Sequence, residues 1–223
     1  ARVPKTNRIR DIMMDRSLAG ETHIDVLEHR DALLEAVCKL VSSLLSTDSW
    51  EVSLYETFPL LAETLDVNWI GLYQNTEDAS GNNAYRLVVT SCSLERDVDQ
   101  CNMNVWEKFC RFPHFANMRE QLEGNIVLTG CAIGGDPELR ELFCDSGVLS
   151  ILAIPVFVNL KWWGFIALSD CKNERNWAKS EVDALTLLAN ELGGTIRRVR
   201  TEKIRSATLR ISEAAHLAEN LDA

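Results

Sequence analysis

The sequence has no apolar run long enough to cross a membrane. A transmembrane helix needs about 18 or more consecutive apolar residues, and every apolar run here is shorter. The basic residues 1–10 are not followed by the apolar core of a signal peptide. We therefore expect no direct membrane insertion of this chain and a cytoplasmic location.

Closely paired cysteines are also absent. The chain contains seven cysteines, an odd number, and no two of them stand at the C-x-x-C spacing. This pattern argues against a zinc site and against a secreted disulfide framework. Cysteines scattered among apolar neighbours are typical of small core residues in a reducing compartment. The sequence predicts no metal site.

Positive charge is scarce, since 23 lysines and arginines face 33 acidic residues and the formal net charge is -10. An acidic surface repels phosphate backbones and anionic lipids, so we do not expect nucleic acid as a partner. The hydrophobic fraction of 46% is ordinary for a globular protein. The chain can therefore build a core.

Two segments with apolar residues at helical spacing flank the sequence. A heptad-like stripe predicts a helix over residues 24–47, and a second long helix is predicted from about Ser180 onward. The pair Gly193-Gly194 costs this second helix roughly 1 kcal/mol per glycine, which close packing against a neighbour would explain. We predict that both helices pair with their copies in a homodimer. The predicted dimer residues are Leu27, Leu34, Val41, Leu192, Ile196 and Val199.

A shorter helix is predicted between these two. Asp48 and Ser49 are favourable N-cap residues. Its predicted apolar face consists of Leu54, Phe58, Leu61 and Leu65. Pro59 lies inside this pattern and is predicted to kink or restart the helix, because proline cannot donate a backbone hydrogen bond.

Four segments are predicted to be strands. They are residues 67–75, 84–93, 148–158 and 162–170. A turn-rich loop joins the first two into a hairpin. The last two are apolar without alternation, as in strands that are covered on both faces. We expect them to be adjacent antiparallel strands in the middle of a sheet, joined by a tight turn at Asn159-Leu160. This order of elements predicts an α+β fold with an antiparallel sheet.

Aromatic residues gather in the irregular segment that precedes the second pair of strands. Helices can cover one face of the sheet, and the other face then needs a second layer that could close over a cavity. We predict a ligand pocket on that face. Its predicted lining is Trp106, His114, Phe115, Phe143, Trp162 and Trp163. Successive strand residues point to opposite faces, so one of the two adjacent tryptophans should face the helices.

The C-terminal part of this sequence resembles the second half of a GAF domain, of the kind found in bacterial multidomain sensor proteins. The resemblance is specific over residues 138–198. It includes an apolar strand with a proline, a Trp-Trp-Gly-Phe strand, Asp-Cys, Arg-x-Trp, and a helix ending in Ile-Arg-Arg. The matching residues are Pro155, Trp162, Trp163, Gly164, Phe165, Asp170, Cys171, Arg175, Trp177, Glu181, Leu185 and Ile196. Ala178 stands where the family often has a capping serine, and Ser180 could cap the helix instead.

The resemblance implies a GAF-like α+β fold. A central antiparallel sheet would carry helices on one face and a ligand pocket on the other, with long N- and C-terminal helices. We expect a tail or linker over 1–23, a signalling helix over 24–47, the GAF domain over 48–200 and a linker helix over 201–223. The final residues resemble the lead-in to a downstream module.

The function implied by the resemblance is a non-catalytic sensory input domain. It would bind a small molecule and signal through the dimer helices to an output domain in the same chain. A histidine kinase of a two-component system is the first expectation for that output. A cyclic-di-GMP cyclase or phosphodiesterase is the alternative. The sequence leaves the identity of the ligand open.

Particular residues argue for or against two classes of GAF protein. Bilin-binding relatives attach their pigment through a cysteine followed by histidine, a pair that this sequence lacks, so we expect no covalent bilin. An alternative function is a thiol-based redox sensor or an enzyme similar to free methionine-R-sulfoxide reductase. Cys92, Cys101 and Cys131 would then be the reactive thiols.

Overall fold

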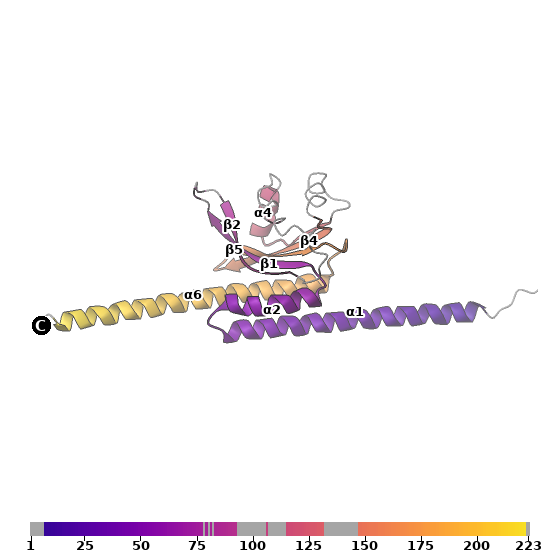
Figure 1. Cartoon of the computed structure of the whole chain (residues 1–223), viewed down its shortest axis with the longest axis horizontal. Coiled ribbons are helices and arrows are strands. Elements are labelled where there is room, and N and C mark those ends of the chain that lie inside the picture. Colours follow the sequence, from indigo (N-terminus) through magenta and orange to yellow (C-terminus); the bar gives the residue numbers. More distant parts are fainter. Residues whose placement is uncertain are drawn as a thin grey trace, which may run out of the picture.

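The computed structural model describes one sheet packed on a layer of long helices (Figure 1). It describes the backbone of residues 7–77, 79, 81, 83–92, 106, 115–131 and 147–221. Side chains are described over the same ranges except 7–26, 115–117 and 215–221.

The five strands form a single antiparallel sheet of order β2-β1-β5-β4-β3. The strands are β1 Trp69–Glu77, β2 Asn83–Cys92, β3 Leu128–Cys131, β4 Ser150–Val158 and β5 Lys161–Asp170. Both predicted hairpins are confirmed, and β4 and β5 lie side by side in the interior of the sheet. The short edge strand β3 was not predicted from the sequence. The predicted α+β fold is confirmed.

Three helices cover one face of the sheet, which we call the helical face. The described helices are α1 Asn7–Ser46, α2 Trp50–Thr64, α4 Phe115–Glu123 and α6 Lys179–Leu221. α2 and α6 contact the sheet, and α1 packs across α2 and α6. α4 lies on the opposite side of the sheet, which we call the outer face (Figure 1).

The helical face buries an aliphatic core. The predicted apolar face of α2 is confirmed, because Leu54, Phe58 and Leu61 are all 1% exposed or less. Leu185 and Leu188 of α6 are also fully buried in this core. Fully burying such a side chain contributes about 1.5–3 kcal/mol, so this layer supplies much of the stability of the fold.

Part of the predicted dimer stripe belongs to this core, which corrects the prediction. Leu192 and Ile196 of α6 are 0% and 5% exposed, so they pack against the sheet of their own chain. A stripe at helical spacing shows that a face is covered but not what covers it. Leu27 and Leu34 of α1 are 38% and 46% exposed and stay available to a partner. The two valines of the stripe, Val41 and Val199, are half-buried beside the core.

Two further expectations about helices are corrected, namely that the first helix begins at Ile24 and that the second restarts at Pro59. α1 begins at Asn7 rather than Ile24, because the polar residues before Ile24 are mostly good helix formers even without an apolar period. α2 continues through Pro59 to Thr64. Pro59 removes the hydrogen bond to the Tyr55 carbonyl, but both residues are exposed, so water can satisfy that carbonyl.

Two glycines allow close contacts between elements. A Cβ atom at Gly193 would lie closer than 3.0 Å to the Phe157 carbonyl oxygen of β4. The close packing predicted for this part of α6 is therefore confirmed. A Cβ at Gly164 of β5 would collide in the same way with the Tyr73 carbonyl oxygen of β1. A Cβ at Gly194, by contrast, would meet no described atom within 4 Å.

The predicted tight turn joins β4 to β5. Asn159 and Leu160 have φ angles of 52° and 61°, and this left-handed conformation at both positions is typical of a two-residue hairpin turn. Asparagine tolerates the conformation, whereas leucine adopts it rarely. The turn therefore holds a strained residue in the middle hairpin.

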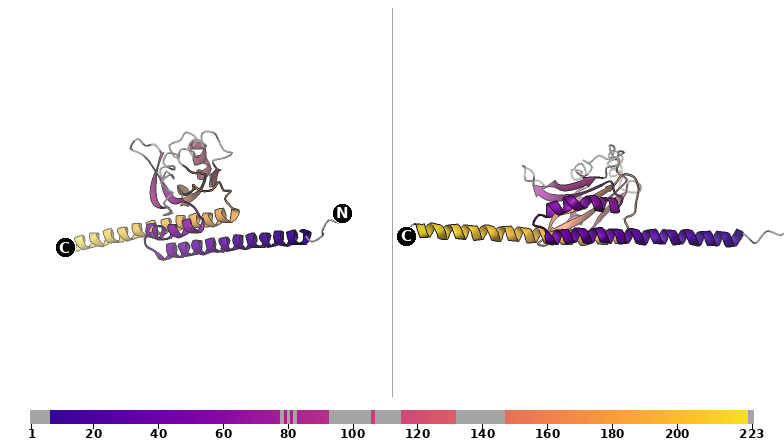
Figure 2. Two further views of the ribbon diagram at one scale, coloured as in Figure 1. Left: turned by 45° about the vertical axis from the view of Figure 1, so that its right-hand side comes forward. Right: turned by 60° about the horizontal axis from the view of Figure 1, so that its bottom comes forward.

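The long helices extend beyond the sheet at opposite ends of the molecule. α1 enters from one end, α6 leaves at the other, and the two run in the same direction (Figure 2). Among the described helices, none combines the length and apolar character of a membrane span. The two helices thus connect the sheet to whatever precedes and follows it.

Candidate ligand-binding face

The outer face carries a second core that is separate from the aliphatic one. Its buried members are Trp69, Tyr73, Trp106, Leu122, Leu128, Val148, Ile151, Ala153, Phe165 and Ala167. Aromatic rings make up much of this cluster, and Leu122 of α4 covers part of it. The two faces of one sheet therefore differ in chemistry.

Four aromatic rings of this core pack on one another. Tyr73 stacks on Phe165 with ring centroids 5.1 Å apart, and Trp106 lies 5.8 Å from Phe165. Trp69 stacks on Trp106 at 6.5 Å. The Trp106 indole Nε1 donates a hydrogen bond of 2.9 Å to the Ser169 hydroxyl. Trp106 is therefore fixed above β1 and β5.

Small residues in the middle strands make room for these rings. Ala167 of β5 pairs with Gly71 of β1 on one side and with Ala153 of β4 on the other. A Cβ atom at Gly71 would overlap the Trp69 ring, which lies over it. These three small residues leave space above the sheet for the aromatic side chains.

A β-bulge directs Trp162 to the outer face. Val156 pairs with Gly164, but the next residue of β4, Phe157, pairs with Trp162, so Trp163 is the extra residue. Strict alternation from Phe165 would place Trp163 on the outer face, and the bulge reverses this. Trp162 therefore packs on the outer-face core, whereas Trp163 packs on the aliphatic core of the helical face.

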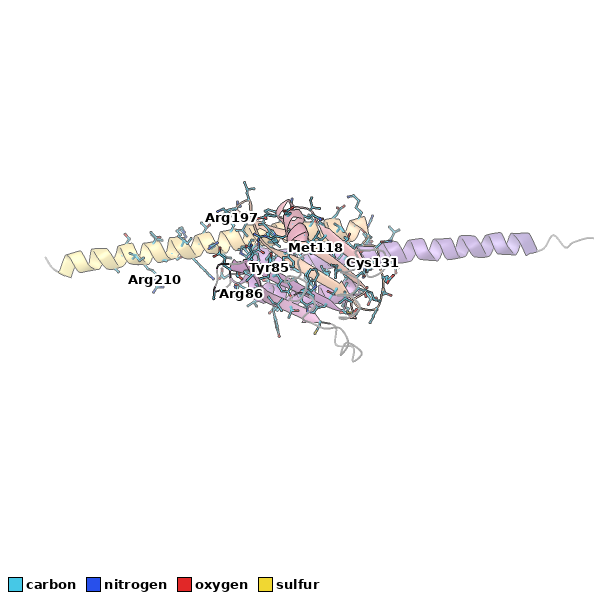
Figure 3. All side chains as sticks on the ribbon, turned by 90° about the horizontal axis from the view of Figure 1, so that it is seen from above. Tyr85, Arg86, Met118, Cys131, Arg197 and Arg210 are labelled. Atoms are coloured by element: carbon cyan, nitrogen blue, oxygen red, sulfur yellow. The ribbon has the colours of Figure 1, made fainter. Side chains whose placement is uncertain are left out.

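Trp162 is the common neighbour of several outer-face side chains. Its ring lies 6.4 Å from that of Phe165 and 6.2 Å from that of Tyr85. The Arg119 guanidinium of α4 lies 5.9 Å from the Trp162 ring centroid. The Asn75 amide nitrogen donates a 3.0 Å hydrogen bond to the Trp162 carbonyl oxygen. Figure 3, seen from above the outer face, shows Tyr85 close to Met118 of α4 and Cys131 farther along the sheet.

Polar atoms around Trp162 are buried without hydrogen-bond partners. Within the described part of the chain, Trp162 Nε1, Arg119 Nε and Asn75 Oδ1 are enclosed and make no hydrogen bond. Each unmet buried group costs about 1–3 kcal/mol, and such groups are rare in native proteins. This concentration of unmet atoms makes the surroundings of Trp162 the candidate site.

The six residues predicted to line a pocket separate into three groups. Trp106 and Trp162 lie on the outer face. Trp163 does not, because the bulge turns it toward the helices, where it contacts Trp50 edge-on at 5.7 Å. The other three lie outside the described side chains: His114, Phe115 and Phe143.

Several outer-face residues were not recognised in the sequence. Trp69, Tyr73 and Asn75 occupy alternate positions of β1, and this period of two places them on one face. The signal was present, but the buried residues between them hide the alternation. Arg119 had no comparable signal, because its role depends on where α4 packs.

A second Arg-over-Trp arrangement lies where β5 ends. Arg175 donates to the Leu65 carbonyl oxygen at 2.7 Å and hydrogen-bonds the Glu181 carboxylate. It lies 3.6 Å from the buried Asp170 carboxylate, and its guanidinium sits 4.4 Å from the Trp177 ring centroid. Arg175 therefore ties the end of β5 to the end of α2 and the start of α6.

Glu181 extends this network to the first helix. Its Oε2 accepts a 2.7 Å hydrogen bond from the Ala178 backbone N–H and so caps α6. Ser180, considered as the cap from the sequence, instead lies inside the helix. His29 Nε2 of α1 lies 3.5 Å from the other Glu181 oxygen, Oε1. One carboxylate thus links the entry of α6 to α1.

The candidate thiols do not converge. Cys92 ends β2 and Cys131 ends β3, the two opposite edges of the sheet. They are about 19 Å apart, since neighbouring strands are about 4.8 Å apart. These two cysteines therefore cannot form a reactive pair with each other, and Cys101 lies outside the described residues.

Cys171 departs from the expectation that all cysteines are reduced, because it is disulfide-bonded. The sequence spacing gave no sign of this bond, since a disulfide depends on proximity in the fold. Over the described ranges, no group of three His, Cys, Asp or Glu side chains could hold a metal ion.

Comparison with known proteins identifies the family. A sequence profile of the GAF domain family matches residues 29–196. The methanogenesis regulatory histidine kinase FilI of Methanothrix harundinacea (strain 6Ac) is 28% identical over 182 residues, which make up 81% of this chain and 20% of that protein. The chain therefore spans about a fifth of the length of this curated relative.

Solved structures show the same fold. The phycocyanobilin-bound GAF domain from a cyanobacterial phytochrome aligns with a TM-score of 0.56 at 16% identity, over 78% of this chain and 96% of that one. The blue-light absorbing form of the Thermosynechococcus elongatus PixJ GAF domain aligns with a TM-score of 0.51 at 16% identity, over 72% and 92%. The family profile covers most of the chain and the fold agrees with it, so the chain belongs to the GAF domain family.

Proposed function

We propose that this chain is the sensory input domain of a signal-transduction protein. A small molecule binds the outer face, and the long helices carry the response to an output domain. The observation that carries the proposal is α6, which packs against the sheet and then continues out of the domain for a total of 43 residues. A helix of this kind can report a change in the sheet at a distance.

A direct path connects the candidate site to α6. Trp162, on the outer face, pairs with Phe157 of β4 at the bulge. The Phe157 carbonyl oxygen is the atom that closely approaches Gly193 of α6 on the other face. A ligand that shifts Trp162 would therefore move backbone that touches the helix, with no long chain of side chains between them.

A homodimer would cover the apolar residues that the helices leave exposed. Leu34 of α1 and Leu187 of α6, which are 46% and 51% exposed, line one groove of about 330 Å³. Leu45 and Gly194 line a second groove of about 530 Å³. A second copy in a parallel bundle would fill both grooves and keep the two output domains on one side.

The output domain is proposed to be a histidine kinase, as part of a two-component system. The curated relative is a histidine kinase of which this chain covers 20%. In this proposal residues 24–47 form the signalling helix, 48–200 the sensor, and 201–223 the linker to the output. Residues 1–23 precede the signalling helix as a linker, and residues 7–23 of that linker already belong to α1. The sensor itself is non-catalytic and cytoplasmic.

The ligand is proposed to bind without a covalent bond. The chain has no cysteine followed by histidine, and the free thiols Cys92 and Cys131 lie at opposite edges of the sheet. For the same reason we expect no reduction of free methionine sulfoxide. Sustained reduction of free methionine sulfoxide would establish an enzyme instead of a sensor, provided that the activity is lost when Cys92, Cys101 and Cys131 are replaced by serine.

The dimer is tested by measuring mass in solution. We expect a dimer for the unmodified chain at tens of micromolar and a folded monomer for Leu34→Glu with Leu187→Glu. The matched control is Val52→Glu on α2, which is 52% exposed and lines neither groove. Native mass spectrometry or sedimentation distinguishes the species. A monomeric parent chain contradicts the homodimer.

Cross-linking tests the parallel arrangement. Cys38 is exposed on α1, four residues after Leu34, so a parallel pair would bring the two copies of Cys38 together. A disulfide requires Cα atoms within about 7 Å. Mild oxidation should therefore give a covalent dimer that Cys38→Ser abolishes. A cross-link that survives in Cys38→Ser would contradict the parallel seam.

A further inference from the structure

The atoms left unmet around Trp162 define the chemistry of a ligand. Trp162 Nε1–H and Arg119 Nε–H are two buried donors, and Asn75 Oδ1 is one buried acceptor, none of them hydrogen-bonded within the described residues. Asn75 is held in place because its amide nitrogen already donates to the Trp162 carbonyl oxygen. A complementary ligand must therefore offer acceptor atoms to Trp162 and Arg119, and a donor to Asn75.

The charge of Arg119 favours an anion as that acceptor. Its nearest carboxylate is Glu123 Oε2, at 3.9 Å from Arg119 Nε, and the Glu123 side chain is 55% exposed. A solvated pair at this distance contributes little and leaves the Nε–H free. A ligand anion enclosed on the outer face would form a stronger, charge-assisted hydrogen bond with Arg119.

A carboxylate fits this donor set better than a phosphate does. A carboxylate has two oxygens in one plane and one charge, which matches one guanidinium and one indole N–H. A phosphate carries up to two charges on three oxygens and needs more cationic donors. Arg86, the neighbouring cation of β2, is exposed and hydrogen-bonds Gln74.

Aromatic walls indicate the shape of the rest of the molecule. The ring of Trp162 is flanked by those of Tyr85 and Phe165, at 6.2 and 6.4 Å. Flat apolar rings in offset contact favour a planar, unsaturated ligand. Tyr85 and Trp162 are both only partly buried, so this part of the cluster has surface left to cover.

We infer that the outer face binds a small planar carboxylate, with Arg119 and Trp162 holding its carboxylate group and Tyr85 packing on its body. The inference rests on the proposed sensory function and specifies the ligand class of the same site. Asn75 accepts a hydrogen bond from a donor on the ligand, which favours aromatic carboxylates that carry an N–H or O–H group.

Titration calorimetry with a defined panel tests the ligand class. The probes are benzoate, 4-hydroxybenzoate and indole-3-acetate, each compared with its own uncharged primary amide. We expect at least one carboxylate to bind at least about tenfold more tightly than its amide, as for a hydrogen bond to a charged group. Replacing Arg119 by Gln should remove that preference, whereas binding of the amide should change little.

Two variants separate recognition from folding. Arg86→Gln removes a nearby cation that faces solvent, labelled on β2 in Figure 3, and should leave carboxylate binding unchanged. Trp162→Phe keeps a ring and removes one donor, and should weaken the carboxylate more than the amide. Thermal unfolding of each variant shows that it is folded before it is titrated.

The outcomes distinguish a failure of the carboxylate inference from a failure of the proposed sensory function. Equal binding of carboxylates and amides, or a preference that survives in Arg119→Gln, overturns the carboxylate and leaves a sensor for another ligand. No binding by any probe up to about 10 mM also overturns the carboxylate inference. The sensory proposal itself fails on a different measurement, the absence of a dimer.

Discussion

Each face of the sheet carries an arginine over a tryptophan, and the two pairs differ in how completely they are bonded. On the helical side, Arg175 lies 4.4 Å from the Trp177 ring centroid and bonds to surrounding oxygens, while Trp177 Nε1 donates to the Ile151 carbonyl at 2.9 Å. On the outer side, Arg119 lies 5.9 Å from the Trp162 ring centroid. There, Arg119 Nε and Trp162 Nε1 have no described hydrogen-bond partner.

The difference separates stability from binding. A satisfied polar network in an aliphatic core fixes the positions of the elements that meet there. An unsatisfied one raises the free energy of the unbound state, and a ligand that supplies the missing atoms removes that cost. We therefore expect substitutions on the helical side to change folding, and those on the outer side to change binding.

The largest expected effect is that of Arg175→Met. It leaves the carboxylates of Asp170 and Glu181, which are 0% and 5% exposed, without their cation. Removing one partner of a buried ion pair costs about 3–5 kcal/mol. The free energy of unfolding from urea denaturation measures this loss.

The control for Arg175→Met is Arg205→Met in the projecting part of α6. The hydrogen bond from Arg205 lowers the pKa of the Glu202 carboxyl, yet both groups are fully exposed. Exposed pairs are screened by water, so Arg205→Met should leave the free energy of unfolding unchanged within error. Equal losses in the two variants would contradict the role given to Arg175.

Adjacent glycines of α6 should respond in opposite directions. A Cβ at Gly193 collides with the Phe157 carbonyl oxygen, and overpacking of this kind costs about 1–3 kcal/mol. Gly194→Ala enters open space, and alanine is favoured over glycine in a helix by about 1 kcal/mol. Thermal and urea unfolding of both variants, made in the Leu34→Glu, Leu187→Glu background, separates stability from dimerisation. If both substitutions changed the free energy of unfolding in the same direction, α6 would not contact β4 as described.

The two tryptophans give a smaller and more direct test of the comparison. Trp177→Phe and Trp162→Phe remove similar ring area, but only the first breaks a hydrogen bond, that to the Ile151 carbonyl. We expect Trp177→Phe to be more destabilising by about 1–2 kcal/mol. Urea denaturation without added ligand measures the difference. A larger loss for Trp162→Phe would mean that its indole N–H is bonded in the free protein.

Periodicity accounts for how much of the fold was predictable from the sequence. The unbroken apolar strands β4 and β5 identified the interior hairpin, and Gly193 indicated a close contact before any neighbour was known. Both signals are local, because each follows from what a few consecutive residues require. The stripe through Leu192 was assigned to a dimer, whereas Leu192 packs in the core of its own chain, because a stripe does not say which surface covers it.

The candidate site was less predictable, because it depends on register and on distant packing. The bulge that aims Trp162 outward exists only in the pairing of β5 with β4. Arg119 reaches Trp162 because α4 lies on the outer face. Arg175, Asp170 and Glu181 were recognised as part of a family pattern, but their mutual contacts were not. No spacing along the chain encodes these approaches.

The smallest effect is expected in the turn that joins β4 and β5, apart from both faces. Leu160 has a φ of 61° and is 97% exposed, so its side chain gains little from burial while its backbone is strained. A non-glycine residue in the left-handed region costs on the order of 1 kcal/mol, and glycine removes that cost but gains freedom in the unfolded chain. We therefore expect Leu160→Gly to raise the free energy of unfolding by about 0.5 kcal/mol, measured by thermal and urea unfolding. Asn159→Ala, the matched variant, should lower the free energy of unfolding, because alanine tolerates the same conformation less well than asparagine. If Leu160→Gly destabilised the protein by more than about 1 kcal/mol, the entropy of glycine alone would not account for the loss, and the leucine would have to contact something beyond this chain. A second copy is the first candidate, and the same measurement in the monomeric background would identify it.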